Sequence, residues 1–247
     1  MSVTTISFFR FRGPWARMWA LVSMQFAKGP LRRIPGIGFH KLMGTGAGEG
    51  FDLSPNFGVY VILATWPSEE AARVGIEESN IFTKYRRRSD ESWTLYLETV
   101  RAKGSWDASQ PFSEAAVVPA EGVPVPRTPW VGVLTRATVR PNRLFAFWRS
   151  VPSISEMTAG QPGLHFKLGM GELPFVQLMT FSLWDESQRI QRFAYDPGPH
   201  REAMKMARRE RWFQEELFAR FRVLTASGTW GGSNPVTDPA SEGAGTP

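Results

Sequence analysis

The sequence predicts an α+β protein in which two tandem ferredoxin-like (βαββαβ) repeats pack together as an intrachain dimeric α+β barrel. Two observations support this fold class. An ordered internal repeat runs through most of the 247 residues. Each copy also shows the same order of strand-like and helix-like patterns, which is the order of the split βαβ unit. One such unit leaves a sheet face without helices, so two units can bury those faces against each other.

The repeat divides the chain into residues 1–112 and residues 130–236. Without a gap, Arg10, Arg17 and Ala20 correspond to Arg136, Arg143 and Ala146. Further matches follow in the same order: Pro35–Gly36 with Pro162–Gly163, Phe39 with Phe166, Lys41–Leu42 with Lys167–Leu168, Trp66 with Trp184, Gly104–Ser105–Trp106 with Gly228–Thr229–Trp230, and Pro111 with Pro235. An ordered series of this length favours a duplication over chance.

The first copy begins with a strand at Val3–Arg12, which is rich in Thr, Ile and Phe. Pro14 suits the first turn of a helix, where its missing N–H is not needed. Apolar residues then recur at helical spacing: Trp15, Met18, Trp19, Val22 and Phe26. Ser68 is an N-cap for a second helix with an acidic first turn. The remaining predicted strands are Ile37–Gly44, Phe57–Trp66 and Trp93–Arg101.

The second copy repeats this order of elements. Its predicted strands and helices are Val131–Arg140, Asn142–Arg149, Leu164–Met170, Phe175–Trp184, Asp185–Arg211 and Leu217–Thr225. Residues 113–129 are rich in Pro, Ala and Val and have no helical period, which is typical of a linker. Residues 237–247 are small and polar and are expected to form a loose tail.

Composition limits the chemistry and the partners. The chain has no cysteine, which excludes disulfides, iron–sulfur clusters and a thiolate-ligated haem. The net charge of +6 is scattered in short basic runs such as Arg86–Arg88, which indicate solvated helix faces and not a nucleic-acid interface. The N-terminus lacks a signal-peptide pattern, and no apolar stretch is long enough to span a membrane. We therefore expect a cytoplasmic protein, free or peripheral to a membrane.

Three histidines are the candidate transition-metal ligands of this cysteine-free chain: His40, His165 and His200. His200 follows the break at Pro197–Pro199 and stands in the first turn of the helix that runs to Arg211. It is either a partly exposed capping residue or an axial haem ligand, since a neutral imidazole suits haem iron. Arg201, Lys205, Arg208 and Arg209 share one face of that helix, as a solvated face or as partners for haem propionates or lipid headgroups.

His40 and His165 provide a second, weaker metal hypothesis. They lie on equivalent strands beside Phe39 and Phe166, and strand alternation puts both on one face. With a carboxylate from Glu49, Asp52 or Glu172, they could form a two-His, one-carboxylate iron site. Solvated or partly buried strand histidines are the simpler interpretation. The Gly-rich Gly44–Gly50 lacks the following helix that a dinucleotide site requires.

The chain resembles the spheroidene monooxygenase family of acyclic carotenoid 2-ketolases. The resemblance spans all but the linker and tail, and its most distinctive block runs from RWFQEELFARFRVL to SGTWGG. Other matching segments are SFFRFRG, PGIGFHKLMGTGAGEGF, VYVILATWP, LTRATVRPNRLFAFWRSVPSIS, HFKLGMGELP, TFSLW and PGPHREAM.

This resemblance implies a monooxygenase that contains haem b, uses dioxygen and an external electron donor such as a ferredoxin, and hydroxylates C-2 of a polyene repeatedly until a ketone forms. It implies His200 as the haem ligand and argues against His40 and His165. Arg136 and Arg209 are the weakest candidates for distal hydrogen-bond donors. A polyene substrate comes from a membrane, so the basic charge and surface aromatics fit peripheral contact with an inner or photosynthetic membrane. The alternatives are a non-catalytic haem or lipid carrier and a non-haem or cofactor-free oxygenase of the same fold.

Overall fold

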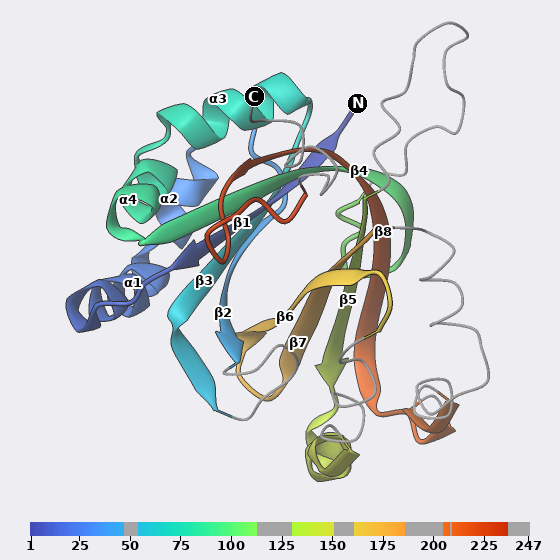
Figure 1. The fold of residues 1–247 in the computed structure, drawn as a ribbon. Coiled ribbons are helices and arrows are strands. Elements are labelled where there is room, and N and C mark those ends of the chain that lie inside the picture. The colour runs from blue at the N-terminus through green and yellow to red at the C-terminus, as the bar shows by residue number, and fades with distance from the viewer. Residues whose placement is uncertain (47–53, 113–129, 151–160, 186–204, 208, 237–247) are drawn as a thin grey trace, which may run out of the picture.

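Eight antiparallel strands close into one barrel in a computed structural model, which describes residues 1–46, 54–112, 130–150, 161–185, 205–207 and 209–236 (Figure 1). The order around the barrel is β1-β3-β2-β6-β7-β5-β8-β4. The strands are β1 Val3–Arg10, β2 His40–Gly46, β3 Pro55–Trp66, β4 Glu91–Gly104, β5 Val131–Val139, β6 Leu164–Leu173, β7 Gln177–Trp184 and β8 Phe213–Gly228. The predicted α+β barrel is therefore confirmed.

Two seams join the strands of the first half to those of the second. The long seam pairs β4 with β8, from Trp93 opposite Gly228 to Gly104 opposite Leu217. The short seam pairs β2 with β6 through Gly44 opposite Gly171 and the neighbouring pair. Between the seams, the strand order is β4-β1-β3-β2 in one half and β8-β5-β7-β6 in the other.

Four helices cover the outer face of the first-half strands: α1 Pro14–Phe26, α2 Lys28–Arg32, α3 Glu69–Glu78 and α4 Asn80–Arg88 (Figure 1). Pro14 occupies the first turn of α1, and the Ser68 hydroxyl caps α3 by accepting a hydrogen bond from the Ala71 amide, as predicted. The helix that begins there is interrupted, because Ser79 has an extended conformation between α3 and α4.

The second half carries the 3-10 turn Pro141–Arg143, after which residues 144–150 are helical, close to the predicted helix Asn142–Arg149. The helix predicted from Asp185 to Arg211 falls mostly outside the described residues. Asp185 itself is a bend, and residues 205–207 and 209 are helical. The complete second βαββαβ unit, and the division into 1–112 and 130–236, therefore stay predictions. The proposed linker and tail lie outside the described residues.

The main hydrophobic core fills the barrel, with Phe8, Trp93, Phe181 and Phe221 fully buried in it. A second core lies between the first-half strands and their helices, around Phe9, Phe82 and Tyr85. Strand alternation explains the division, because successive side chains of β1 point alternately into the barrel and toward the helices. Among the described helices, none has the length and hydropathy to cross a bilayer.

Candidate functional site

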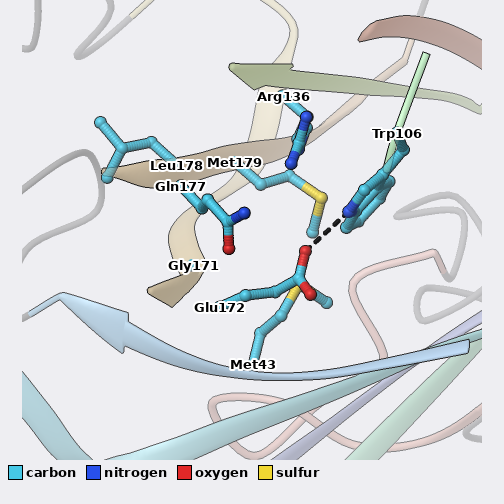
Figure 2. A pocket seen from close by; sticks show the side chains of 8 residues that line it. All are labelled: Met43, Trp106, Arg136, Gly171, Glu172, Gln177, Leu178 and Met179. Carbon is cyan, nitrogen blue, oxygen red and sulfur yellow. Dashed lines mark hydrogen bonds between the residues drawn. The ribbon is translucent and has the colours of Figure 1, made fainter. Parts of the chain in front are cut away.

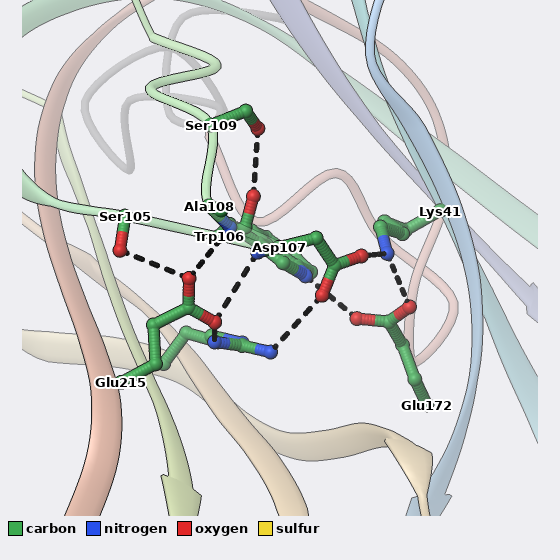
Figure 3. Close-up of polar contacts among 9 residues, drawn as sticks. Lys41, Ser105, Trp106, Asp107, Ala108, Ser109, Glu172 and Glu215 are labelled. Carbon is green, nitrogen blue, oxygen red and sulfur yellow. Dashed lines mark hydrogen bonds and ion pairs between the residues drawn. The ribbon is translucent and has the colours of Figure 1, made fainter.

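Strand alternation brings four charged side chains to the inside of one barrel end: Lys41 on β2, Arg136 on β5, Glu172 on β6 and Glu215 on β8. Each lies two residues from a side chain of the barrel core, namely Met43, Leu134, Met170 and Leu217. Together with Trp106 and Asp107 from the turn after β4, they form what we call the barrel-end cluster (Figure 3).

Trp106 closes this end of the barrel from a tight turn. The Trp106 amide donates to the Ser109 carbonyl at 2.9 Å, and the Ser109 amide donates back at 3.1 Å. Asp107 and Ala108 have positive φ angles of 51° and 57°, which the turn requires. The buried indole donates from Nε1 to Glu172 Oε1 at 2.6 Å (Figure 2). This contact connects the turn to β6.

Lys41 links two carboxylates of the cluster. Its Nζ lies 2.6 Å from Glu172 Oε2 and also forms an ion pair with Asp107 (Figure 3). The ammonium is 5.6 Å from the centre of the Trp106 ring, so the ring adds a weak cation–π attraction. Glu172 thus pairs with Lys41 through Oε2 and accepts the Trp106 hydrogen bond through Oε1.

Glu215 is the most heavily bonded acid of the cluster. It accepts hydrogen bonds from the Ser105 hydroxyl and the Ala108 amide, both at 2.9 Å, from the Asp107 amide, and from Arg136. Burial alone would raise the pKa of Glu215. The donors outweigh burial and lower the pKa to about 2.

Arg136 is the buried cation of the cluster, with 3% of its surface exposed. Its guanidinium pairs with Glu215 and lies 3.6 Å from Asp107. Its Nε makes no hydrogen bond among the described residues. Two cations therefore face three carboxylates, and the ion pairs offset the desolvation of the charges.

The space inside the cluster is small. It is too narrow for a water-sized sphere. Its lining residues are Met43, Trp106, Arg136, Gly171, Glu172, Gln177, Leu178 and Met179 (Figure 2). Neither a long polyene nor a porphyrin fits such a space. The cluster therefore locks the barrel end and holds charges in place, and it is not the substrate chamber.

A simpler version of the same arrangement closes the opposite barrel end. Arg10 Nη1 lies 2.6 Å from Glu91 Oε2, and its guanidinium lies 4.0 Å from the centre of the Trp230 ring. Glu91 Oε1 accepts from the Gly232 amide at 2.7 Å, as Glu215 accepts from the Ala108 amide. The sequence alignment pairs Arg10 with Arg136 but overlooks the two glutamates. Glu91 precedes Trp106 by the same number of residues as Glu215 precedes Trp230, and this equal spacing could have revealed the two glutamates as a matched pair.

The structure separates His40 from His165. Strands β2 and β6 pair antiparallel at Gly44 and Gly171, so the two histidines, which precede these glycines, lie toward opposite ends of that pair. His40 Nδ1 is 2.9 Å from the Gly38 carbonyl, and His165 Nε2 is 3.2 Å from Asp185.

The two-His, one-carboxylate site is therefore wrong. Glu172, one proposed carboxylate partner, is bound to Lys41 and Trp106. Glu49 and Asp52 lie outside the described residues, and within the described ranges no three His, Asp or Glu side chains cluster as metal ligands.

The remaining candidates have separate positions. His200, with Arg201 and Arg208 of its helix, lies outside what the structure describes. Lys205 is exposed, and Arg209 is exposed beside Glu210 at 3.4 Å. Arg136, proposed as a distal donor, points into the barrel and is held by Glu215 and Asp107.

Comparison with known proteins gives three similar sequences, each named spheroidene monooxygenase. The Cereibacter sphaeroides protein is 41% identical over 96% of this chain and 71% of its own length. The Rhodobacter capsulatus protein is 38% identical over 98% of both chains. The Rubrivivax gelatinosus protein is 31% identical over 89% of this chain and 81% of its own. No family model matches the sequence.

Two solved structures of aldoxime dehydratase share the fold. One, in complex with butyraldoxime, has a TM-score of 0.60 at 10% identity and covers 96% of this chain and 84% of its own. The other has a TM-score of 0.58 at 11% identity, with coverages of 95% and 82%. At such low identity, the likeness concerns the fold alone.

Proposed function

The chain belongs to the spheroidene monooxygenase family, and from this premise we propose that it is a haem-dependent enzyme that introduces a 2-keto group into an acyclic carotenoid. It is a monooxygenase and hence an oxidoreductase. The observation that carries the proposal is the 38% identity to the Rhodobacter capsulatus enzyme over 98% of both chains.

The proposed reaction consumes dioxygen and electrons in two rounds. In each round one oxygen atom enters a C–H bond at C-2, and the other leaves as water with two electrons and two protons. An external donor such as a ferredoxin supplies the electrons. A second hydroxylation at the same carbon gives a geminal diol, which loses water to form the ketone.

The donor set of this chain fits a histidine-ligated haem. Cysteine is absent, so a thiolate ligand is excluded. His40 and His165 make local contacts with Gly38 and Asp185. We therefore propose that His200 would hold the haem iron. When bound, the haem would supply the activation of dioxygen.

The outer face of the second-half strands offers the chemistry that an amphipathic flat ligand needs. Val133 and Phe218 contribute to an apolar patch there. Arg220 on β8 lies directly opposite Val133 on β5. Its Nε is buried and makes no hydrogen bond among the described residues. A partly buried cation beside an apolar patch suits a ring system with carboxylates, such as haem with its propionates.

In the reaction, the apolar side chains would hold the polyene and exclude water from the oxidising centre. Arg220 would fix the orientation of an anionic cofactor group. The barrel interior, filled by aromatic side chains such as Phe8 and Trp93, provides a rigid support for that outer face.

The absorption spectrum of protein produced with haem supplied tests the cofactor. We expect a Soret band that His200→Ala abolishes. His40→Ala and His165→Ala are matched controls that keep the band, and Arg220→Leu should weaken haem binding. If the His200→Ala variant binds haem as well as the wild type does, the assignment of His200 as the haem ligand is contradicted. A loaded protein that forms no product with reductant and oxygen would be a carrier, and iron without a Soret band would indicate a non-haem oxygenase.

A further inference from the structure

Helix α1 presents an apolar face to solvent. Along this face Trp15 is 86% exposed, Met18 57%, Val22 49% and Phe26 73%. Their spacing of three and four residues places them in one stripe. We call this stripe, together with Leu21 at its edge, the α1 face. It holds five of the thirteen exposed large hydrophobic residues among the described part of the chain.

The α1 face is separate from the packing of the helix on the protein. The opposite side of α1 buries Ala20, while Trp19 packs against Phe11 and Tyr85. In Figure 1 the helix lies at the margin of the fold, outside the barrel wall. The packing of α1 on the protein therefore does not require Trp15 or Phe26 to be buried. An exposed apolar stripe of this kind is typical of an interaction site.

The chain is basic before, within and after α1. The sequence from Arg10 to Arg33 contains no Asp or Glu. Its exposed cations are Arg12, Arg17, Lys28, Arg32 and Arg33. From α4, the Arg88 guanidinium lies 4.6 Å from the centre of the Trp19 ring and adds another cation. The nearby acid Asp90 accepts a hydrogen bond from the Arg12 amide at 2.7 Å.

We propose that the α1 face is the site at which this protein docks on an anionic membrane surface. Exposed Trp, Phe and Met side chains enter the boundary between headgroups and acyl chains, while the flanking cations attract anionic lipids. A helix of 13 residues is about 20 Å long and can lie in the interface plane without crossing it. The docking surface is argued from α1 itself. Only the reason for docking rests on the proposed function, because a long polyene substrate is stored in lipid.

Vesicle sedimentation of the full chain tests the docking surface. We expect binding to vesicles of phosphatidylcholine with about one third phosphatidylglycerol, and weaker binding at high salt. The double variant Trp15→Gln, Phe26→Gln should bind at least about tenfold more weakly, because the apolar area is lost. Arg32→Ser, Arg33→Ser should lower binding to the anionic vesicles by about fivefold per cation.

Phe145→Gln is the matched control, because Phe145 is 82% exposed but lies in the second half of the chain. It should bind vesicles as the wild type does. Binding of the α1 double variant at wild-type strength would overturn the proposal. So would a wild-type dimer that the double variant dissociates while neither protein binds vesicles, since the face would then join two copies.

Vesicle binding and enzyme turnover can be tested independently of each other. Turnover of a carotenoid dispersed in detergent does not require docking, so the double variant should keep that turnover while losing vesicle binding. Vesicle binding without any turnover would leave the docking surface intact and remove the proposed reaction.

Discussion

The indole nitrogen of Trp106 lies 2.6 Å from Glu172 Oε1 and thereby joins the turn after β4 to β6. These residues belong to different halves of the chain, so the contact adds a side-chain link to the strand pairing at the two seams. Lys41, from β2, contacts the second oxygen of the same carboxylate. One barrel end is thus fixed by residues from three separate strands or turns.

Trp106→Phe should destabilise the protein by about 2 kcal/mol, because it removes a hydrogen bond to a charged acceptor but keeps an aromatic ring. Trp230→Phe at the opposite barrel end is the control, since no hydrogen bond from its indole is seen within the described residues. Chemical denaturation measures both. Equal losses for the two variants would show that ring size and not the Glu172 contact determines the effect.

Arg136→Met should lower stability by roughly 3–5 kcal/mol, because it leaves Glu215 and Asp107 without their buried cation. The double variant with Glu215→Gln should recover part of the loss, which a double-mutant cycle would measure. Arg73→Met breaks the exposed pair with Glu69 and should change stability by no more than about 0.5 kcal/mol. A similarly small effect at Arg136 would contradict a tightly coupled cluster.

Acid should destabilise the protein through Glu215. Its pKa falls from 4.5 to about 2 in the folded state, so the unfolded chain binds more protons between these values. The contribution is fully present above about pH 4.5 and is lost as pH falls toward 2, with a slope of at most about 1.4 kcal/mol per pH unit. Glu215→Gln should flatten the slope in this range, and Ser105→Ala should reduce it. An unchanged slope in Glu215→Gln would refute the assignment.

Gly104→Ala should destabilise the protein by about 2–4 kcal/mol. Gly104 has a φ angle of +103°, and an added Cβ would lie 2.1 Å from the Glu216 carbonyl oxygen. The turn that carries Trp106 follows directly, so its position would shift. Gly29→Ala in α2 meets no atom within 4 Å and should be neutral or mildly stabilising. Thermal unfolding compares the two, and a loss in Gly29→Ala as large as that in Gly104→Ala would argue against backbone strain.

The strands were predictable from the sequence because one side of each faces a core. Composition rich in Thr, Ile and Phe marked Val3–Arg12, and the internal repeat marked Val131–Arg140, both close to the observed bounds. Strand ends were harder to predict. β8 begins at Phe213, whereas the pattern begins at Leu217, because Glu215 faces inward and interrupts the apolar series. The inward carboxylate is stabilised there by donors distant in sequence, among them Ala108 and Arg136, which lie 107 and 79 residues away.

Contacts made through turns were not predictable. Glu172 was considered as an iron ligand because its type and position fit one, yet the Trp106 turn and Lys41 occupy both of its oxygens. Helical spacing of Trp15, Met18, Val22 and Phe26 predicted α1 correctly. The same spacing does not tell which neighbour covers a stripe, and the structure leaves this one exposed.

Incubation of the haem-loaded protein with an acyclic carotenoid, a reductant and ¹⁸O₂ tests the central claim most directly. Mass spectrometry of the hydroxylated product, whose C–O bond does not exchange with water, should show one ¹⁸O atom per hydroxyl group at C-2. No such label should appear with His200→Ala, whereas His40→Ala should behave as the wild type. An unlabelled hydroxyl group, or a product that forms equally well without His200, would contradict the account.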